Sequence, residues 1–141
     1  MFKSMTPILW SKSVEDSVAF YESKLGFTLA FAMRDPEGKI EHAMIAKDAV
    51  SLMVGYQRGE DGEKVTEGLG GGPELYFDLE AVDGYYASVQ RAGAPITVAL
   101  ADQYWGDRTF TVTDPDGYRL TFSQTVRAFD PSQPMLEAVP A

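Results

Sequence analysis

The sequence of 141 residues contains no cysteine and only one histidine, His42. The absence of thiols excludes disulfides, thiolate nucleophiles, zinc–thiolate sites and iron–sulfur clusters. No pattern places a partner beside His42, so the sequence suggests no catalytic triad. We interpret His42 as a structural or surface residue, and an acid/base role for it alone stays open.

Positive charge is also scarce, because 12 Lys and Arg residues face 21 Asp and Glu residues, a formal net charge of -9. Nucleic acids and anionic membranes require a basic footprint, so we expect neither as a partner. An acidic field would favour a cationic ligand, although it also simply keeps a protein soluble. Residues 1–7 lack the apolar core of a signal peptide, and no apolar run approaches the roughly 18 residues of a membrane span. We therefore expect a soluble, cytoplasmic protein.

The clearest structural pattern is a β-hairpin within residues 103–124. Two alternating runs flank residues 114–117, Asp-Pro-Asp-Gly, in which proline and glycine favour a tight turn. Alternation in the second run predicts a core face and a face turned to a wet cavity. The core face carries Leu120 and Phe122, and the wet face carries Arg119, Thr121 and Ser123.

Two helices are predicted. The first begins after Ser13 as N-cap, carries the apolar stripe Val14, Val18, Tyr21 and Leu25, and ends at Gly26. The second covers residues 82–92 and is closed by Gly93. Strands are predicted over residues 6–11, 27–34, 39–46, 50–56, 74–79, 96–100, 109–113 and 118–123.

The two halves of the chain repeat one another at an offset of about 68 residues, too long for a solenoid unit. Residues 13–16 align with 81–84, and residues 48–53 align with 116–121. The division is a first βαβββ module (1–56), a flexible Gly-rich linker (57–72), a second module (73–127) and a Pro-containing tail (128–141). Met135, Leu136 and Val139 in the tail could dock on the domain. The prediction is an α+β fold in which two tandem modules form a curved mixed sheet around a cleft.

Two motifs carry a resemblance to a known family. Ser17-Val18-Ala19-Phe20-Tyr21 with Leu25-Gly26-Phe27 resembles the helix signature of the vicinal oxygen chelate (glyoxalase/bleomycin resistance protein/dioxygenase) superfamily. Trp105-Gly106-Asp107-Arg108, followed by residues 114–119, is similar to the second-module signature of its bleomycin-resistance and PhnB-like branches. The resemblance covers roughly residues 5–124 and implies the glyoxalase/bleomycin resistance fold, which hosts several chemistries.

The resemblance also implies where catalytic members hold a metal ion. The corresponding positions here are Thr6 and Glu74 on the first strands, and Met53 and Thr121 on the last strands. Only Glu74 suits a divalent cation, whereas a metal site needs about three protein ligands. We therefore expect no metal, no cofactor and no catalytic residue of the family's usual kind.

The open sheet faces should line a small-molecule site with aromatic walls and a few carboxylates. The predicted ligand-binding residues are Trp10, Met53, Glu74, Tyr76, Trp105, Arg108 and Thr121. Such a site suits an aromatic or cationic compound by stacking and cation–π contact. A simpler interpretation is that the two tryptophans are packing residues and that Arg108 ties its loop to Asp107, Asp114 or Asp116.

These observations predict a metal-independent protein that binds and sequesters a small molecule, as in antibiotic resistance. The resemblance implies a homodimer with the pocket at the subunit interface. One alternative is a glyoxalase-like lyase or isomerase, or another enzyme, that uses Glu74 as a base. Another is a dimeric module with no ligand.

Overall fold

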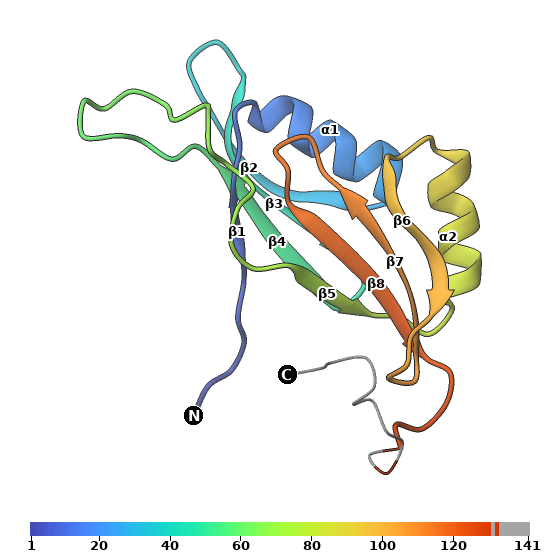
Figure 1. Ribbon diagram of the computed structural model, residues 1–141. Helices are drawn as coiled ribbons and strands as arrows, with labels where there is room; N and C mark the ends of the chain where they lie inside the picture. Colours follow the sequence, from blue (N-terminus) through green and yellow to red (C-terminus); the bar gives the residue numbers. More distant parts are fainter. Residues whose placement is uncertain (131, 133–141) are drawn as a thin grey trace.

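The computed structural model describes residues 1–130 and 132, which form two helices and two four-stranded mixed sheets (Figure 1). The first sheet has the order β1-β4-β3-β2 and the second the order β5-β8-β7-β6. In each sheet the first strand pairs in parallel with the last, and the remaining pairs are antiparallel. The predicted α+β fold of two βαβββ units is therefore confirmed. The elements are β1 Ile8–Trp10, α1 Val14–Leu25, β2 Thr28–Arg34, β3 Ile40–Lys47, β4 Val50–Gly55, β5 Leu75–Asp78, α2 Val82–Arg91, β6 Ile96–Asp102, β7 Asp107–Thr113 and β8 Arg119–Thr125.

Helix α1 has the boundaries that its sequence predicts. The Ser13 side chain accepts a hydrogen bond from the Asp16 N–H, which satisfies one of the free donors of the first turn. Gly26 ends the helix in the left-handed region at φ 77°, where glycine has no Cβ penalty. The residues of the predicted stripe are all buried: Val14, Val18, Tyr21 and Leu25.

The predicted hairpin is also present, as strands β7 and β8. The Gly117 N–H donates to the Asp114 carbonyl at 3.0 Å, and Gly117 has φ 95°. The Asp114 carboxylate is buried inside the turn and accepts hydrogen bonds from the N–H groups of Asp116 and Tyr118 at 2.9 and 3.0 Å. The turn therefore has its own polar core, besides the backbone bond that closes it.

One hydrophobic core joins the two units. Leu120 and Phe122 are buried as predicted, and Phe122 stacks on Phe77 with 4.9 Å between ring centroids. Figure 1 shows α1 and α2 next to each other on one side of the strands. The Tyr85 hydroxyl of α2 donates to the Leu25 carbonyl of α1 at 2.6 Å, which ties the helices together.

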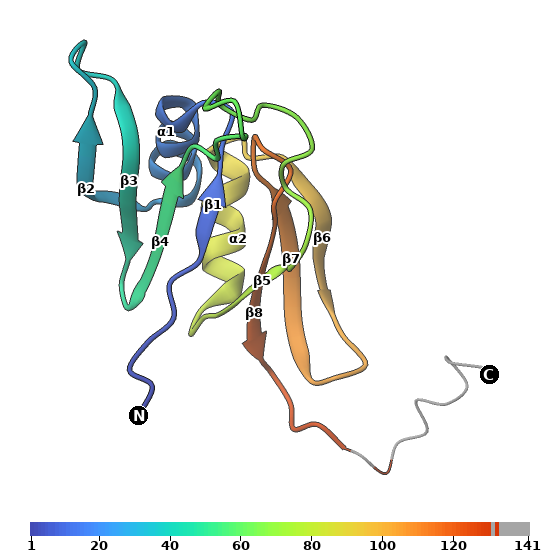
Figure 2. The same ribbon diagram turned by 90° about the vertical axis from the view of Figure 1, so that its left-hand side faces the viewer.

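The sheets lie side by side, with β2 and β6 toward the outer sides of the molecule and β1 near the middle (Figure 2). The segment between the two sheets makes defined contacts. Arg58 and Lys64 form an isolated β-bridge, and Gly70 packs against the backbone of Asp116 and Gly117. The flexibility of the linker stays a prediction, and the structure places its Gly70 against the hairpin turn of the second unit.

Strand β6 extends to Asp102, beyond the predicted end at residue 100. Met135, Leu136 and Val139 of the tail lie outside the described residues. Within residues 1–130 and 132, no helix has the length and apolar character of a membrane span.

Candidate functional site

The face of the first sheet that is turned away from α1 is apolar. Strand pairing aligns its side chains in two rows that cross the sheet. Within this face, Ile8, Phe31 and Met33 are 46%, 56% and 56% exposed. Isolated exposed apolar residues are common on proteins, whereas a contiguous group of them marks an interaction surface. We call this surface the apolar face; its rows are Phe31–Met44–Met53–Ile8 and Met33–His42–Gly55–Trp10.

Gly55 makes room for two large rings in the second of these rows. A Cβ at Gly55 would lie 2.8 Å from His42 Nδ1 and 3.5 Å from Trp10 Cζ3. The imidazole and the indole therefore occupy the space above a residue without a side chain. The predicted ligand-binding residues Trp10 and Met53 both lie on the apolar face, and His42 lies beside them.

The second sheet carries an aromatic group of different character. The Tyr76 hydroxyl donates to Asp107 Oδ2 at 2.6 Å, and Trp105 Nε1 lies 3.1 Å from both the hydroxyl and Oδ2. Thr125 donates to the other carboxylate oxygen. These hydrogen bonds lower the pKa of Asp107, and the one from Tyr76 has the largest effect. The structure thus brings Tyr76 and Trp105 together around one carboxylate that stays ionised.

The strand face beneath this group is not wet, contrary to the sequence prediction. Thr121 and Ser123 are 6% and 1% exposed. The Thr121 hydroxyl lies 2.8 Å from that of Thr111 and donates to Glu74 Oε1 at 3.0 Å, while Ser123 donates to the Phe77 carbonyl. Hydroxyl groups on this face are therefore paired within the protein, and Glu74 and Thr121 form one connected pair.

Arg108 has different partners from those predicted. Its guanidinium binds Asp102 at 2.6 Å and Asp83 of α2 at 3.1 Å, and not Asp107, Asp114 or Asp116. Strand alternation puts Arg108 on the same side as Phe110, which packs against α2. The hydrogen bond from Arg108 lowers the pKa of Asp102, and the Asp102 and Asp83 carboxylates raise that of Arg108. Arg108 thus ties β6 and β7 to the first turn of α2, away from Tyr76.

The four positions that correspond to the family's metal ligands do not fit a metal ion. Three of them carry a threonine or a methionine: Thr6, Met53 and Thr121. The fourth, Glu74, accepts hydrogen bonds at one oxygen from Thr121 and Arg119 at 3.0 and 3.1 Å. In the described part of the chain, no group of three or more His, Cys, Asp and Glu residues is arranged to hold a metal.

Within residues 1–130 and 132, no hydrogen bond, ion pair or ring contact joins the side chains of the apolar face to those of the Tyr76–Trp105 group. Trp10 and Met53 belong to the first unit, and Glu74, Tyr76, Trp105 and Thr121 belong to the second. One chain therefore presents two separate sets of predicted residues.

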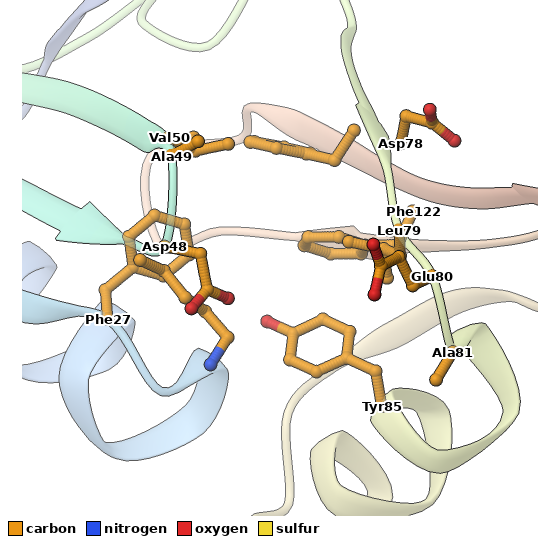
Figure 3. Close-up of a pocket in the computed structure, with 12 residues that line it drawn as sticks. Phe27, Asp48, Ala49, Val50, Asp78, Leu79, Glu80, Ala81, Tyr85 and Phe122 are labelled. Carbon is orange, nitrogen blue, oxygen red and sulfur yellow. The ribbon is translucent and has the colours of Figure 1, made fainter.

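A cavity of about 550 Å³ lies elsewhere, at the junction of the two units (Figure 3). None of the predicted ligand-binding residues lines it. It is bounded by the β3–β4 turn, by the end of β5 and by α2, with Phe77, Phe122 and Tyr85 as aromatic walls. Lys47 Nζ lies 5.7 Å from the centre of the Tyr85 ring, and burial raises the pKa of the Tyr85 hydroxyl. Sequence reasoning missed this cavity, although the repeat aligns Val50 beside it with the larger Tyr118.

Taken together, the fold and its surfaces define an α+β protein built from two βαβββ repeats. The model of the Glyoxalase/Bleomycin resistance protein/Dioxygenase superfamily matches residues 5–122, and the chain belongs to this superfamily.

Several relatives are similar along most of their length. A bleomycin resistance protein of Geobacillus stearothermophilus is 29% identical over 133 residues, covering 86% of this chain and 96% of the relative. An uncharacterised protein of Mycobacterium tuberculosis (strain ATCC 25618 / H37Rv) is 28% identical over 128 residues, covering 88% of this chain and 75% of the relative.

Solved structures of other proteins are similar to this fold. The crystal structure of TioX from Micromonospora sp. ML1 has a TM-score of 0.71 at 25% identity, covering 88% of this chain and 99% of that chain. TnmS3, an antibiotic binding protein from Streptomyces sp. CB03234, has a TM-score of 0.68 at 20% identity, covering 89% and 97%. The latter likeness shows the fold alone.

Proposed function

We propose that this protein binds and sequesters a small molecule of antibiotic type, without bond chemistry and without a metal. The observation that carries the proposal is the apolar face, where Phe31, Met33 and Ile8 stay exposed beside Trp10 and Met53. Methionine and aromatic side chains adapt to ligands of varied shape, which suits capture. The likeness to bleomycin resistance proteins supports the same class of ligand.

We further propose that a cytoplasmic homodimer completes the site. One chain separates its two sets of candidate residues, so a second copy is needed to bring the apolar face of one protomer toward the Tyr76–Trp105 group of its partner. The resulting pocket would have aromatic walls and the ionised Asp107 at its edge. Such a pocket suits an aromatic or cationic compound.

An enzyme that uses Glu74 as a base is a weaker explanation. Glu74 Oε1 already accepts hydrogen bonds from Thr121 and Arg119, which supports a structural role in joining β5 to β8. Turnover of a glutathione hemithioacetal that is lost in Glu74→Gln would support the enzyme over the binder.

The binding proposal is tested with bleomycin as the probe, using calorimetry for binding and analytical ultracentrifugation for the dimer. Met53→Glu places a charge in the middle of the apolar face. It is expected to lower the affinity at least tenfold and to weaken the dimer, because a buried unpaired carboxylate is costly. Ala19→Glu adds the same charge at an exposed position of α1 and is the matched control.

The expected result is a dimer that binds bleomycin, with binding lost in Met53→Glu and retained in Ala19→Glu. Unchanged binding in Met53→Glu would contradict the assignment of the face. Absence of binding by the unmodified protein to bleomycin and to a panel of cationic aromatic antibiotics would contradict the function.

A further inference from the structure

One difference between the two units lies at the equivalent positions Val50 and Tyr118. Each residue follows the tight turn before the last strand of its unit, and the repeat aligns residues 48–53 with 116–121. By the same alignment, Asp78 at the end of β5 corresponds to Trp10 at the end of β1. A comparison of these two positions therefore shows how each unit packs against the first strand of the other unit.

Tyr118 closes the first junction with its side chain. Its hydroxyl donates to the Trp10 carbonyl at 2.9 Å and accepts from the Trp10 N–H at 2.9 Å. The residue is 9% exposed. β1 is an edge strand, and its outward backbone groups at Trp10 would otherwise lack a partner in the protein. A phenol thus caps the free edge of β1.

Val50 leaves the second junction open. Valine has no hydroxyl to pair with a backbone, and the cavity of about 550 Å³ is lined by both Val50 and Asp78. The Leu79 N–H donates to the Ser123 carbonyl, so alternation turns the backbone N–H and C=O of Asp78 away from β8. Figure 3 shows the Asp78 carboxylate pointing away from the cavity, although Asp78 lines it, so the residue offers its backbone there.

We infer that this cavity is a binding site for a phenol, separate from the proposed antibiotic site. The ligand's hydroxyl would donate to the Asp78 carbonyl and accept from the Asp78 N–H, as Tyr118 does at Trp10. Its ring would lie among Phe77, Phe122 and Tyr85, which favour an aromatic group by edge and stacked contacts. The cavity volume lies in the range of small-molecule sites.

The ligand is an uncharged phenol. The cavity's charged side chains have both signs, the cationic Lys47 and the anionic Asp48 and Glu80, and its walls are mostly apolar. A phenol is neutral at pH 7, since the ordinary pKa of such a hydroxyl is about 10. It therefore loses little hydration on entering, whereas an ion would lose much more.

The test uses p-cresol as probe and toluene as its partner without the hydroxyl, measured by calorimetry and by NMR shifts of the Asp78 amide. The protein is expected to bind one p-cresol per chain and to bind toluene roughly tenfold more weakly, because toluene leaves the Asp78 backbone groups unpaired. Val50→Tyr supplies the phenol from the chain and is expected to abolish p-cresol binding. Val50→Thr keeps the volume of valine and is expected to bind p-cresol as the unmodified protein does.

Three results would overturn the inference: no saturable binding of p-cresol, equal affinity for toluene, or undiminished binding by a folded Val50→Tyr. If Val50→Tyr does not fold, Val50→Phe, which fills the ring space alone, must still weaken p-cresol binding. The outcome is independent of the antibiotic site, because Met53→Glu should leave p-cresol binding unchanged and Val50→Tyr should leave bleomycin binding unchanged.

Discussion

The Tyr21 hydroxyl donates a hydrogen bond to Asp114 Oδ2 at 2.7 Å, which joins helix α1 to the hairpin turn of the other unit. Both groups are buried, and Asp114 accepts two backbone hydrogen bonds as well. Burial raises the pKa of Asp114, and the hydrogen bond from Tyr21 opposes this rise. Burial and the neighbouring Asp114 raise the pKa of Tyr21 well above its ordinary value, so the phenol stays a donor.

Tyr21→Phe is expected to lower the free energy of unfolding by about 1–3 kcal/mol at pH 7, since it leaves a buried carboxylate with one donor fewer. The deficit should be smaller near pH 4. The raised pKa means that the folded chain holds the Asp114 proton to a higher pH than the unfolded chain does. The contribution of Asp114 to the free energy of unfolding is therefore fully present below its pKa in the unfolded chain. It is lost as the pH rises through its pKa in the folded chain. Removing the Tyr21 hydroxyl raises the pKa of Asp114 in the folded chain further, so more stability is lost at pH 7.

Urea unfolding of both proteins between pH 4 and pH 8 measures this effect. Tyr86→Phe is the matched control, because the Tyr86 hydroxyl makes no hydrogen bond within the described residues. A deficit in Tyr21→Phe that does not change with pH would show that Asp114 is not its cause.

Gly70→Ala is expected to destabilise the protein by about 1–3 kcal/mol, because an alanine at positive φ is strained. Gly70 has φ 80°, and a Cβ there would lie 2.2 Å from the carbonyl oxygen of Asp116, which is backbone and cannot move aside cheaply. Gly71→Ala is the control, since its Cβ would meet nothing within 4 Å. Thermal unfolding of the two variants gives the comparison, and equal melting temperatures would mean that the linker does not pack on the hairpin turn in solution.

Arg108→Ala is expected to raise the pKa of Asp102 toward its ordinary value of about 3.9, because the hydrogen bond from Arg108 is the main cause of its lowering. The pair is exposed, so the shift should shrink as salt is added. NMR titration of the Asp102 carboxyl carbon measures it directly. Arg119→Ala removes an exposed arginine whose partner is Glu74 and should leave Asp102 unchanged. An unaltered Asp102 titration in Arg108→Ala would show that the ion pair does not persist in solution.

Local patterns allowed much of the fold to be predicted. The Ser13 cap, the Gly26 terminus and the turn at residues 114–117 depend on neighbouring residues alone, so the sequence contains their whole cause. The repeat of about 68 residues predicted two like units, since equal spacing of like elements implies like folds.

Side-chain partners from distant elements could not be predicted in the same way. The buried hydroxyls of Thr121 and Ser123 pair with Glu74 and with the Phe77 carbonyl, and alternation along β8 says nothing of those partners. Arg108 reaches Asp83 only because α2 packs over β7. The cavity beside Val50 needed a comparison of the two units side chain by side chain, which the alignment with Tyr118 permits but composition does not.

The apolar face is sensitive to oxidation. Met33, Met44 and Met53 occupy neighbouring strands of one surface. Oxidants convert thioethers to polar sulfoxides, and reductases specific for each epimer reverse the change. Under the proposed function, this oxidation would leave the secondary structure intact but make the surface polar, so affinity for apolar compounds would fall until the methionines were reduced again.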